Sequence, residues 1–376
     1  MSSNARQSLT DARRWVIKIG SAVLTDNGQG LNKASIERLA QNVIALREDG
    51  AEVIIVSSGA VAAGLARLNM TMRPSALDQL QAAAAVGQSS LVQAYEAAFA
   101  PSGYLCAQIL LSHDDVRSRE RYLNARATLQ TLLAQGVIPI VNENDTVVTD
   151  EIRFGDNDTL AALVANLIDA DLLVMLTDQA GLFNTDPRAT PDAQLISEAD
   201  AHDTTLDKMV SEGTALGRGG MISKLRAARL AARSGALAII ADGREPETVG
   251  ALKRGAPVGT LLTTDKQPQP ARKQWLASLL YPKGAVTLDD GAVRGICDLG
   301  RSLLPVGVVD VSGDFVRGDL VRCLDTRGQE IARGLCNYSA VETRKLRGRA
   351  STEIESILGF GGDEELIHRD NLITTR

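Results

Sequence analysis

The sequence lacks the patterns that mark several common classes of protein. Its four cysteines form no C-x-x-C pair and lie far along the chain from the three histidines, which argues against a zinc site and against a disulfide framework. No apolar run approaches membrane-spanning length, and residues 1–14 contain no apolar stretch of the kind that a signal peptide needs. We therefore expect a cytoplasmic protein with no membrane partner.

Two common nucleotide-binding motifs are also missing. The chain has no G-x-x-x-x-G-K-[ST] loop and no G-x-G-x-x-G after a strand. His368-Arg369-Asp370 has the letters of the protein-kinase catalytic loop, but no D-F-G follows, so we treat the match as coincidence. Any phosphate-binding site in this protein must therefore use residues other than these two glycine-rich motifs.

A strong excess of charge is absent as well. The net charge is −6 and the charged residues are spread along the chain, which gives no broad attraction for nucleic acid or anionic lipid. The local exception is the basic stretch 344–349, which we interpret as a solvated helix face and, as the alternative, as a contact to RNA phosphates. RNA is thus not expected as a partner.

The length of the chain and its hydrophobic pattern indicate a large α/β domain. A chain of 376 residues exceeds one usual domain of roughly 100–200 residues, and a hydrophobic fraction of 44% is ample for burying cores. Strand-length apolar runs alternate with helical patterns over the first two thirds, which predicts a mostly parallel sheet covered by helices on both faces. The predicted strands are 15–19, 52–56, 105–111, 137–141, 172–176 and 236–240, and the clearest helical patterns are 36–46 and 160–168.

The composition and the periodicity of the sequence change near residue 263. Residues 265–270 are polar, contain two prolines and show no periodicity, so we expect a linker over 266–280 between domains 1–265 and 281–376. Beyond it, short strand-like pieces separated by glycines predict a small all-β module, with strands at 285–288, 307–311 and 320–324.

A polar cluster follows one of the predicted strands. Residues 142–145 read Asn-Glu-Asn-Asp directly after the apolar run 137–141, and residues 155–158 read Gly-Asp-Asn-Asp. Polar groups at the carboxyl ends of strands point into the ligand crevice of open α/β sheets. The cluster therefore predicts a polar small-molecule site, in which Glu143, Asp150 and Glu151 are expected to be only solvated loop surface.

Three further segments carry groups suited to phosphate. Lys18 lies inside an apolar strand, where a charge is costly unless it faces a partner, although a strand-end lysine can also extend to solvent. The stretches 217–224 and 57–60 are glycine- and serine-rich turns before helices, which present backbone N–H groups to anions but also occur as ordinary loops. Thr177-Asp178 ends another strand and has a helix N-cap as its alternative role.

Together, these segments resemble the amino-acid kinase superfamily. The segments are 16–20, 57–60, 142–145, 155–158, 176–178 and 219–224, and within the superfamily they are most similar to the glutamate 5-kinases. Residues from about 283 to 360 resemble a PUA domain. The resemblance implies a three-layer α/β/α sandwich with a mainly parallel sheet, followed by a small all-β PUA-like barrel.

The resemblance also implies roles for individual residues. Lys18 and Lys224 would hold the ATP phosphates and the transferring group, with Asp158 positioning both lysines, while Ser58, Asp145 and Asn157 would bind glutamate. No protein residue is expected as a metal ligand, because Mg²⁺ would be held mainly by the ATP phosphates. The implied ATP-binding residues are Lys18, Thr177, Asp178, Arg218, Gly219, Gly220, Met221, Ile222, Ser223 and Lys224. Ser21, Ser57 and Arg218 differ from the residues that are most common at the matching motif positions of the family. These differences concern individual contacts to the nucleotide.

The implied reaction is ATP-dependent phosphorylation of the side-chain carboxylate of L-glutamate, the first step of proline biosynthesis. The acceptor has a pKa of about 4.3 and is already ionised at neutral pH, so the reaction needs no general base. Feedback inhibition by proline and a homo-oligomer, dimer or tetramer, are implied as well. The alternatives are another amino-acid kinase, for example one acting on acetylglutamate, and an RNA-binding protein acting through the PUA-like module.

Overall fold

The computed structural model describes residues 3–25, 28, 30–112, 115, 119–147, 157–211, 220–264, 282–360 and 362–375. The chain forms two compact units, Met1–Pro268 and Gln269–Arg376. The expected linker at 266–280 lies outside the described residues, so the expected domain limits at 265 and 281 stay a prediction.

The first unit is built on one sheet of eight strands in the order β3-β4-β2-β1-β5-β7-β8-β6. All neighbouring strands are parallel except β7 and β8, which are antiparallel. The strands are β1 (Arg14–Ile19), β2 (Glu52–Val56), β3 (Cys106–Leu111), β4 (Ile138–Glu143), β5 (Leu172–Thr177), β6 (Glu198–Asp200), β7 (Leu237–Asp242) and β8 (Thr260–Thr263). The predicted parallel sheet is confirmed, and the six predicted strands lie within two residues of the observed ones.

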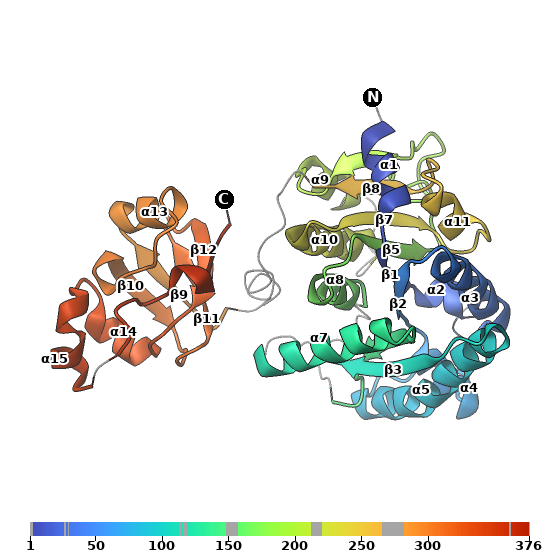
Figure 1. The fold of residues 1–376 in the computed structure, drawn as a ribbon, viewed down its shortest axis with the longest axis horizontal. Coiled ribbons are helices and arrows are strands. Elements are labelled where there is room, and N and C mark those ends of the chain that lie inside the picture. The colour runs from blue at the N-terminus through green and yellow to red at the C-terminus, as the bar shows by residue number, and fades with distance from the viewer. Residues whose placement is uncertain are drawn as a thin grey trace. The chain divides into compact units, whose positions relative to one another are not determined.

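Helices cover both faces of this sheet (Figure 1). The helices α8 and α10 lie on one face, and α3 and α11 lie on the other. The helices of the unit are α1 (Ser3–Asp11), α2 (Ser21–Leu24), α3 (Lys33–Glu48), α4 (Ala60–Arg67), α5 (Leu77–Phe99), α7 (Arg119–Ala134), α8 (Asn157–Leu167), α9 (Thr205–Ser211), α10 (Met221–Ala231) and α11 (Thr248–Lys253). No helix in the described part of the chain is long and apolar enough to span a membrane.

The central strands β1, β2, β4 and β5 are almost continuous apolar runs because they are buried on both faces. In β1 the five residues from Trp15 to Ile19 are all buried, and they include Lys18. The strand β1 pairs with β2 on one side and β5 on the other, so the strand order reverses around it. A ligand crevice forms at the carboxyl ends of strands at such a reversal.

The second unit contains a sheet of five strands in the order β10-β9-β11-β12-β13. Its strands are β9 (Gly284–Leu288), β10 (Val308–Gly313), β11 (Leu320–Leu324), β12 (Glu330–Leu335) and β13 (Leu372–Thr374), and its core is separate from that of the first unit. It also contains α13 (Asp290–Cys297), α14 (Ala340–Leu346) and α15 (Ile354–Leu358).

Of these three helices, α13 and α15 were not expected from the sequence, while α14 overlaps the basic stretch 344–349 that was interpreted as a helix face. The sequence carries a signal for two of them, because Asp289 and Ser339 are N-caps that accept from the backbone N–H groups of Ala292 and Glu342. Ser339 and Glu342 form a complete capping box. The helices are short, at most eight residues, so their periodicity is weak in the sequence.

Candidate functional site

The site lies where β1, β2, β4 and β5 end at one edge of the sheet. Lys18 is next to last in β1, and its strand partners are Val56 in β2 and Met175 in β5. Asn142 and Glu143 end β4, and Thr177 ends β5. Parallel pairing brings these polar groups together because the carboxyl ends of all four strands point the same way.

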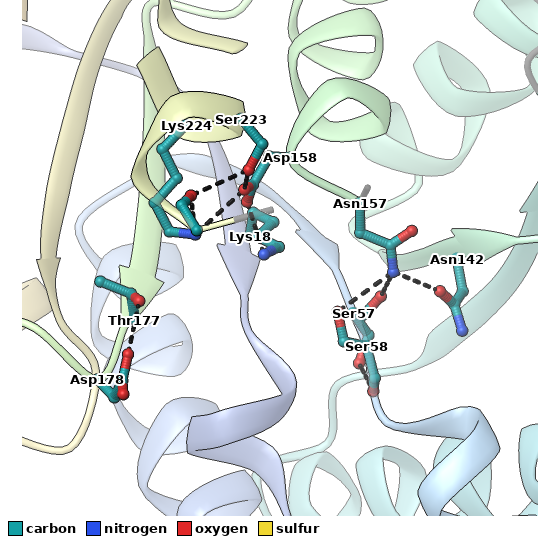
Figure 2. A network of polar contacts seen from close by, with 11 residues as sticks. Lys18, Ser57, Ser58, Asn142, Asn157, Asp158, Thr177, Asp178, Ser223 and Lys224 are labelled. Atoms are coloured by element: carbon teal, nitrogen blue, oxygen red, sulfur yellow. Dashed lines mark hydrogen bonds and ion pairs between the residues drawn. The ribbon is translucent and has the colours of Figure 1, made fainter. Parts of the chain in front are cut away.

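Asp158 joins two lysines from distant parts of the chain (Figure 2). It lies in the first turn of α8, and its Oδ1 is 2.6 Å from Lys18 Nζ while its Oδ2 is 3.1 Å from Lys224 Nζ. Ser223 Oγ donates a hydrogen bond of 2.6 Å to Asp158 Oδ2. The structure therefore brings together the two lysines predicted to hold the phosphates and the carboxylate predicted to position them.

The charges of this centre do not cancel. Lys18, Asp158 and Lys224 are only 5%, 3% and 7% exposed, so their attraction is weakly screened. Burial by itself would raise the pKa of Asp158, but the two neighbouring ammonium groups and the Ser223 hydrogen bond lower it below its usual value. One carboxylate between two ammonium groups leaves a net positive charge, which suits a phosphoryl group.

The start of α10 holds Lys224 in place. Gly220 precedes the helix, and its carbonyl oxygen accepts a hydrogen bond from Lys224 Nζ at 3.3 Å and lies 3.0 Å from Ser223 Oγ. Arg218 and Gly219, predicted for the same loop, lie outside the described residues. The ammonium group of Lys224 is thus tied to its own helix start and to Asp158.

Asn157 organises the other half of the site. Its Nδ2 donates to Ser57 O at 2.6 Å and to Asn142 Oδ1 at 2.9 Å, and Ser58 Oγ lies 3.2 Å from the same nitrogen (Figure 2). Ser57 and Ser58 follow β2, so this one amide links the ends of β2, β4 and α8. The fully buried Tyr95 supports the same loop, since its OH lies 3.0 Å from Ser57 Oγ.

Asp145 lies beside this cluster. No hydrogen bond joins it to Asn157 or Ser58 in the part of the chain that the structure describes; it lines a separate cavity with Gln88. Gln88, which lines the same cavity, accepts a 3.0 Å hydrogen bond from Asn142 Nδ2 and so connects this cavity to the amide network. Burial raises the pKa of Asp145 to about 6, although the charge of Arg73 opposes the shift.

Glu143 differs from the expectation. It was expected on solvated loop surface with Asp150 and Glu151, but it is the last residue of β4 and only 4% exposed. The strand continues two residues further than the apolar run, because Leu110 and Leu111 of β3 pair with Asn142 and Glu143. Asp150 and Glu151 lie outside the described residues.

A second cavity adjoins the two-lysine centre. Thr177 and Asp178 lie on one side of it, and the start of α10 from Gly220 to Lys224 lies on the other. Sequence reasoning missed the rest of its lining, because no motif or periodicity marks a loop residue that faces a cavity. The missed residues are Gln179, Leu182, Phe183, Thr185, Asp186, Pro187, Arg188 and Met209.

This second cavity combines an apolar wall with a charged end. Leu182, Phe183 and Met221 can cover a flat aromatic base, while Lys224 lies at the end that adjoins Asp158. Ligand pockets are commonly mostly apolar with a few placed polar groups. The arrangement fits a nucleotide whose phosphates extend towards the lysines.

The protein offers no cage for a metal in its described part. No group of three or more His, Cys, Asp or Glu side chains there is arranged to hold an ion. Asp158 is already engaged by two ammonium groups and a hydroxyl. These residues fit Mg²⁺ that arrives bound to the phosphates of a nucleotide. In such complexes Mg²⁺ is usually held by substrate phosphates, waters and at most one or two carboxylates.

Comparison with known proteins gives two family matches. The model of the amino acid kinase family matches residues 13–242, and the model of the PUA domain matches residues 284–358. The glutamate 5-kinase of Nitrosococcus oceani is 58% identical over 371 residues, which are 98% of this chain and 99% of that protein. The glutamate 5-kinase of Teredinibacter turnerae is 59% identical over 368 residues, again 98% of this chain and 99% of that protein.

A solved structure agrees with the fold. The carbamate kinase from Giardia lamblia bound to AMP-PNP has a TM-score of 0.50 and 19% sequence identity, and the match covers 68% of this chain and 100% of that chain. At this identity the match concerns the fold alone.

Proposed function

This chain belongs to the amino acid kinase family, and from that membership and the geometry of its site we propose that it transfers the γ-phosphoryl group of ATP to the side-chain carboxylate of L-glutamate. The products are glutamyl 5-phosphate and ADP, and the reaction begins proline biosynthesis. The observation that carries the proposal is the position of Asp158, which holds two buried lysines next to the Asn157 amide cluster.

Lys18 and Lys224 act on the phosphoryl group in this proposal. The acceptor carboxylate and the γ-phosphoryl group are both anionic, so the barrier is chiefly their repulsion in a roughly in-line transfer. Two ammonium groups fixed by Asp158 offset that repulsion without having to reorganise during the reaction. Magnesium, carried by the ATP phosphates, supplies further neutralisation of charge when bound.

Glutamate is held by Ser58, Asp145 and Asn157. Asn157 and Ser58 lie on the amide cluster, and Asp145 supplies a carboxylate for the substrate ammonium group. Because the acceptor is ionised at neutral pH, no side chain has to remove a proton. This agrees with a described site in which the central groups are lysines, a carboxylate, amides and hydroxyls.

ATP occupies the cavity between Thr177-Asp178 and the start of α10. The residues proposed to line it are Thr177, Asp178 and the stretch 218–224, with Leu182 and Phe183 added from the structure. Proline, as an inhibitor, would bind in a place that overlaps the glutamate site. A homo-oligomer, dimer or tetramer, and a cytoplasmic location complete the proposal.

The proposal is tested by an acceptor panel. The purified chain is incubated with ATP, Mg²⁺ and one of glutamate, acetylglutamate, aspartate or carbamate, and acyl phosphate is trapped with hydroxylamine. Hydroxamate should form with glutamate. Hydroxamate with acetylglutamate and none with glutamate would overturn the assignment of the substrate.

A further inference from the structure

One wall of the proposed nucleotide cavity is a short two-stranded loop. Phe183 forms an isolated antiparallel bridge with Leu195, and Ile196 N donates to Leu182 O at 2.8 Å. Asn184 N donates to Gln194 O at 3.0 Å and extends this pairing. Leu182 is buried and Phe183 is half-buried, and both line the cavity.

The buried hydroxyl of Thr260 forms hydrogen bonds with the base of this loop. Thr260, the first residue of β8, is 0% exposed. Its Oγ1 accepts a 2.8 Å hydrogen bond from Leu182 N and donates one of 2.5 Å to Ile196 O. The Thr260 hydroxyl therefore contacts both strands of the loop, next to the backbone hydrogen bond from Leu261 N to Ser197 O at 2.9 Å that also joins the second strand to β8.

The loop also approaches Thr260 more closely than most residues would allow. A Cβ on Gly181 would lie 2.6 Å from Thr260 Oγ1 and 3.0 Å from Thr260 N. Since real Cβ atoms do not come so close, only glycine lets the backbone at 181 sit against β8. Gly181 and Thr260 thus form a matched contact that fixes where Leu182 begins.

We propose that Thr260 is a positioning residue for ATP, which acts by fixing the Leu182–Phe183 wall of the nucleotide cavity. The inference rests on the proposed location of the ATP site. Thr260 does not line the cavity and takes no part in the transfer. Its effect is therefore expected on binding of ATP and not on binding of glutamate.

The test replaces the hydroxyl with a methyl group in Thr260→Val. Removing it leaves the buried Leu182 N–H without its acceptor, and the loop must shift to regain one. The net free energy of one hydrogen bond corresponds to about a three- to tenfold change in a binding constant. The KM for ATP should therefore rise by about three- to tenfold. The kcat and the KM for glutamate should stay within about twofold of the unchanged protein.

Two controls accompany this variant. Thr260→Ser keeps the hydroxyl and should restore the KM for ATP. Thr263→Val removes the same group from the same strand, where among the described residues its hydroxyl donates a hydrogen bond of 3.3 Å only to Ala199 O, and should leave the KM for ATP unchanged. If Thr260→Val does not fold, Gly181→Ala probes the same contact from the loop side and should raise the KM for ATP in the same selective way.

Phe183→Ala separates this inference from the location of the nucleotide site. If Phe183→Ala raises the KM for ATP and a folded Thr260→Val or Gly181→Ala does not, the positioning role is overturned alone. If Phe183→Ala leaves the KM for ATP unchanged, the location of the nucleotide site fails and the inference fails with it. An equal rise for ATP and glutamate in Thr260→Val also overturns the role.

Discussion

Asn157 and Asp158 are adjacent at the start of α8, yet their side chains point to opposite halves of the site (Figure 2). Asn157 donates to the ends of β2 and β4, and Asp158 binds Lys18 and Lys224. One helix start thereby sets the distance between the proposed acceptor and the proposed phosphoryl site. Correct spacing of two reactants can lower a barrier by several kcal/mol, about 7–11 in favourable cases.

Removal of either lysine should slow the transfer strongly. Lys18→Ala and Lys224→Ala are each expected to lower kcat by ~10²–10³, because each removes one fixed charge from the transition state. The measurement is glutamate-dependent release of ADP, with circular dichroism as the check on folding. A folded Lys18→Ala with near-normal kcat would remove Lys18 from the mechanism, and the same holds for Lys224.

Loss of the carboxylate should reduce stability as well as activity. Asp158→Ala leaves two buried ammonium groups without their shared partner, and uncompensated buried charge costs about 3–5 kcal/mol. The free energy of unfolding in urea should therefore fall by this amount. Asp207→Ala is a suitable control, because Asp207 pairs with Arg229 at an exposed position and such pairs contribute little. Equal losses in the two variants would contradict the central role of Asp158.

Glutamate binding should weaken as the pH falls through about 6. Burial raises the pKa of Asp145 to about 6, so its carboxylate is charged above that pH and neutral below it. Only the charged form attracts the substrate ammonium group, and the KM for glutamate is expected to rise on acidification. Asp145→Asn should have a high KM with no such dependence. A dependence that persists in Asp145→Asn would assign it to another group.

Inhibition by proline should be relieved by glutamate. If proline occupies a place that overlaps the substrate, rising glutamate displaces it and the apparent inhibition constant grows with glutamate concentration. Initial rates over a grid of both amino acids measure this directly. Inhibition that is independent of glutamate concentration would place proline elsewhere.

The large sheet was readable from the sequence because its strands are buried on both faces. The run at 172–176 is apolar over its whole length and the run at 15–19 is apolar except for Lys18, and they correspond to β5 and β1. The strand β6 was missed because it has only three residues, Glu198–Asp200, and is charged at both ends. The helix α13 was missed for a similar reason, since a short amphipathic helix beside strands gives little periodicity.

In the site, the sequence predicted residue types and the structure supplied their contacts. Lys18 stood out as a charge in an apolar strand, and residues 142–145 and 155–158 stood out as polar groups after one. The roles of Asn157 and Asp158 were implied by the family resemblance, but the burial of Glu143 and the hydrogen bonds from Asn157 to Ser57 and Asn142 were not predicted. Both depend on which strand end lies beside α8, and sequence spacing carries no information about that.

The sequence by itself determined six of the eight strands of the large sheet, their order along the chain and the chemical groups that their ends carry. Apolar runs, caps and glycines act over a few residues, so local physics is enough to place them. Only the tertiary structure decided which groups meet: Asp158 with Lys18 and Lys224, Asn157 with Ser57 and Asn142, and Thr260 with Leu182. These contacts join distant segments, and the parallel order of the sheet brings them within hydrogen-bonding distance.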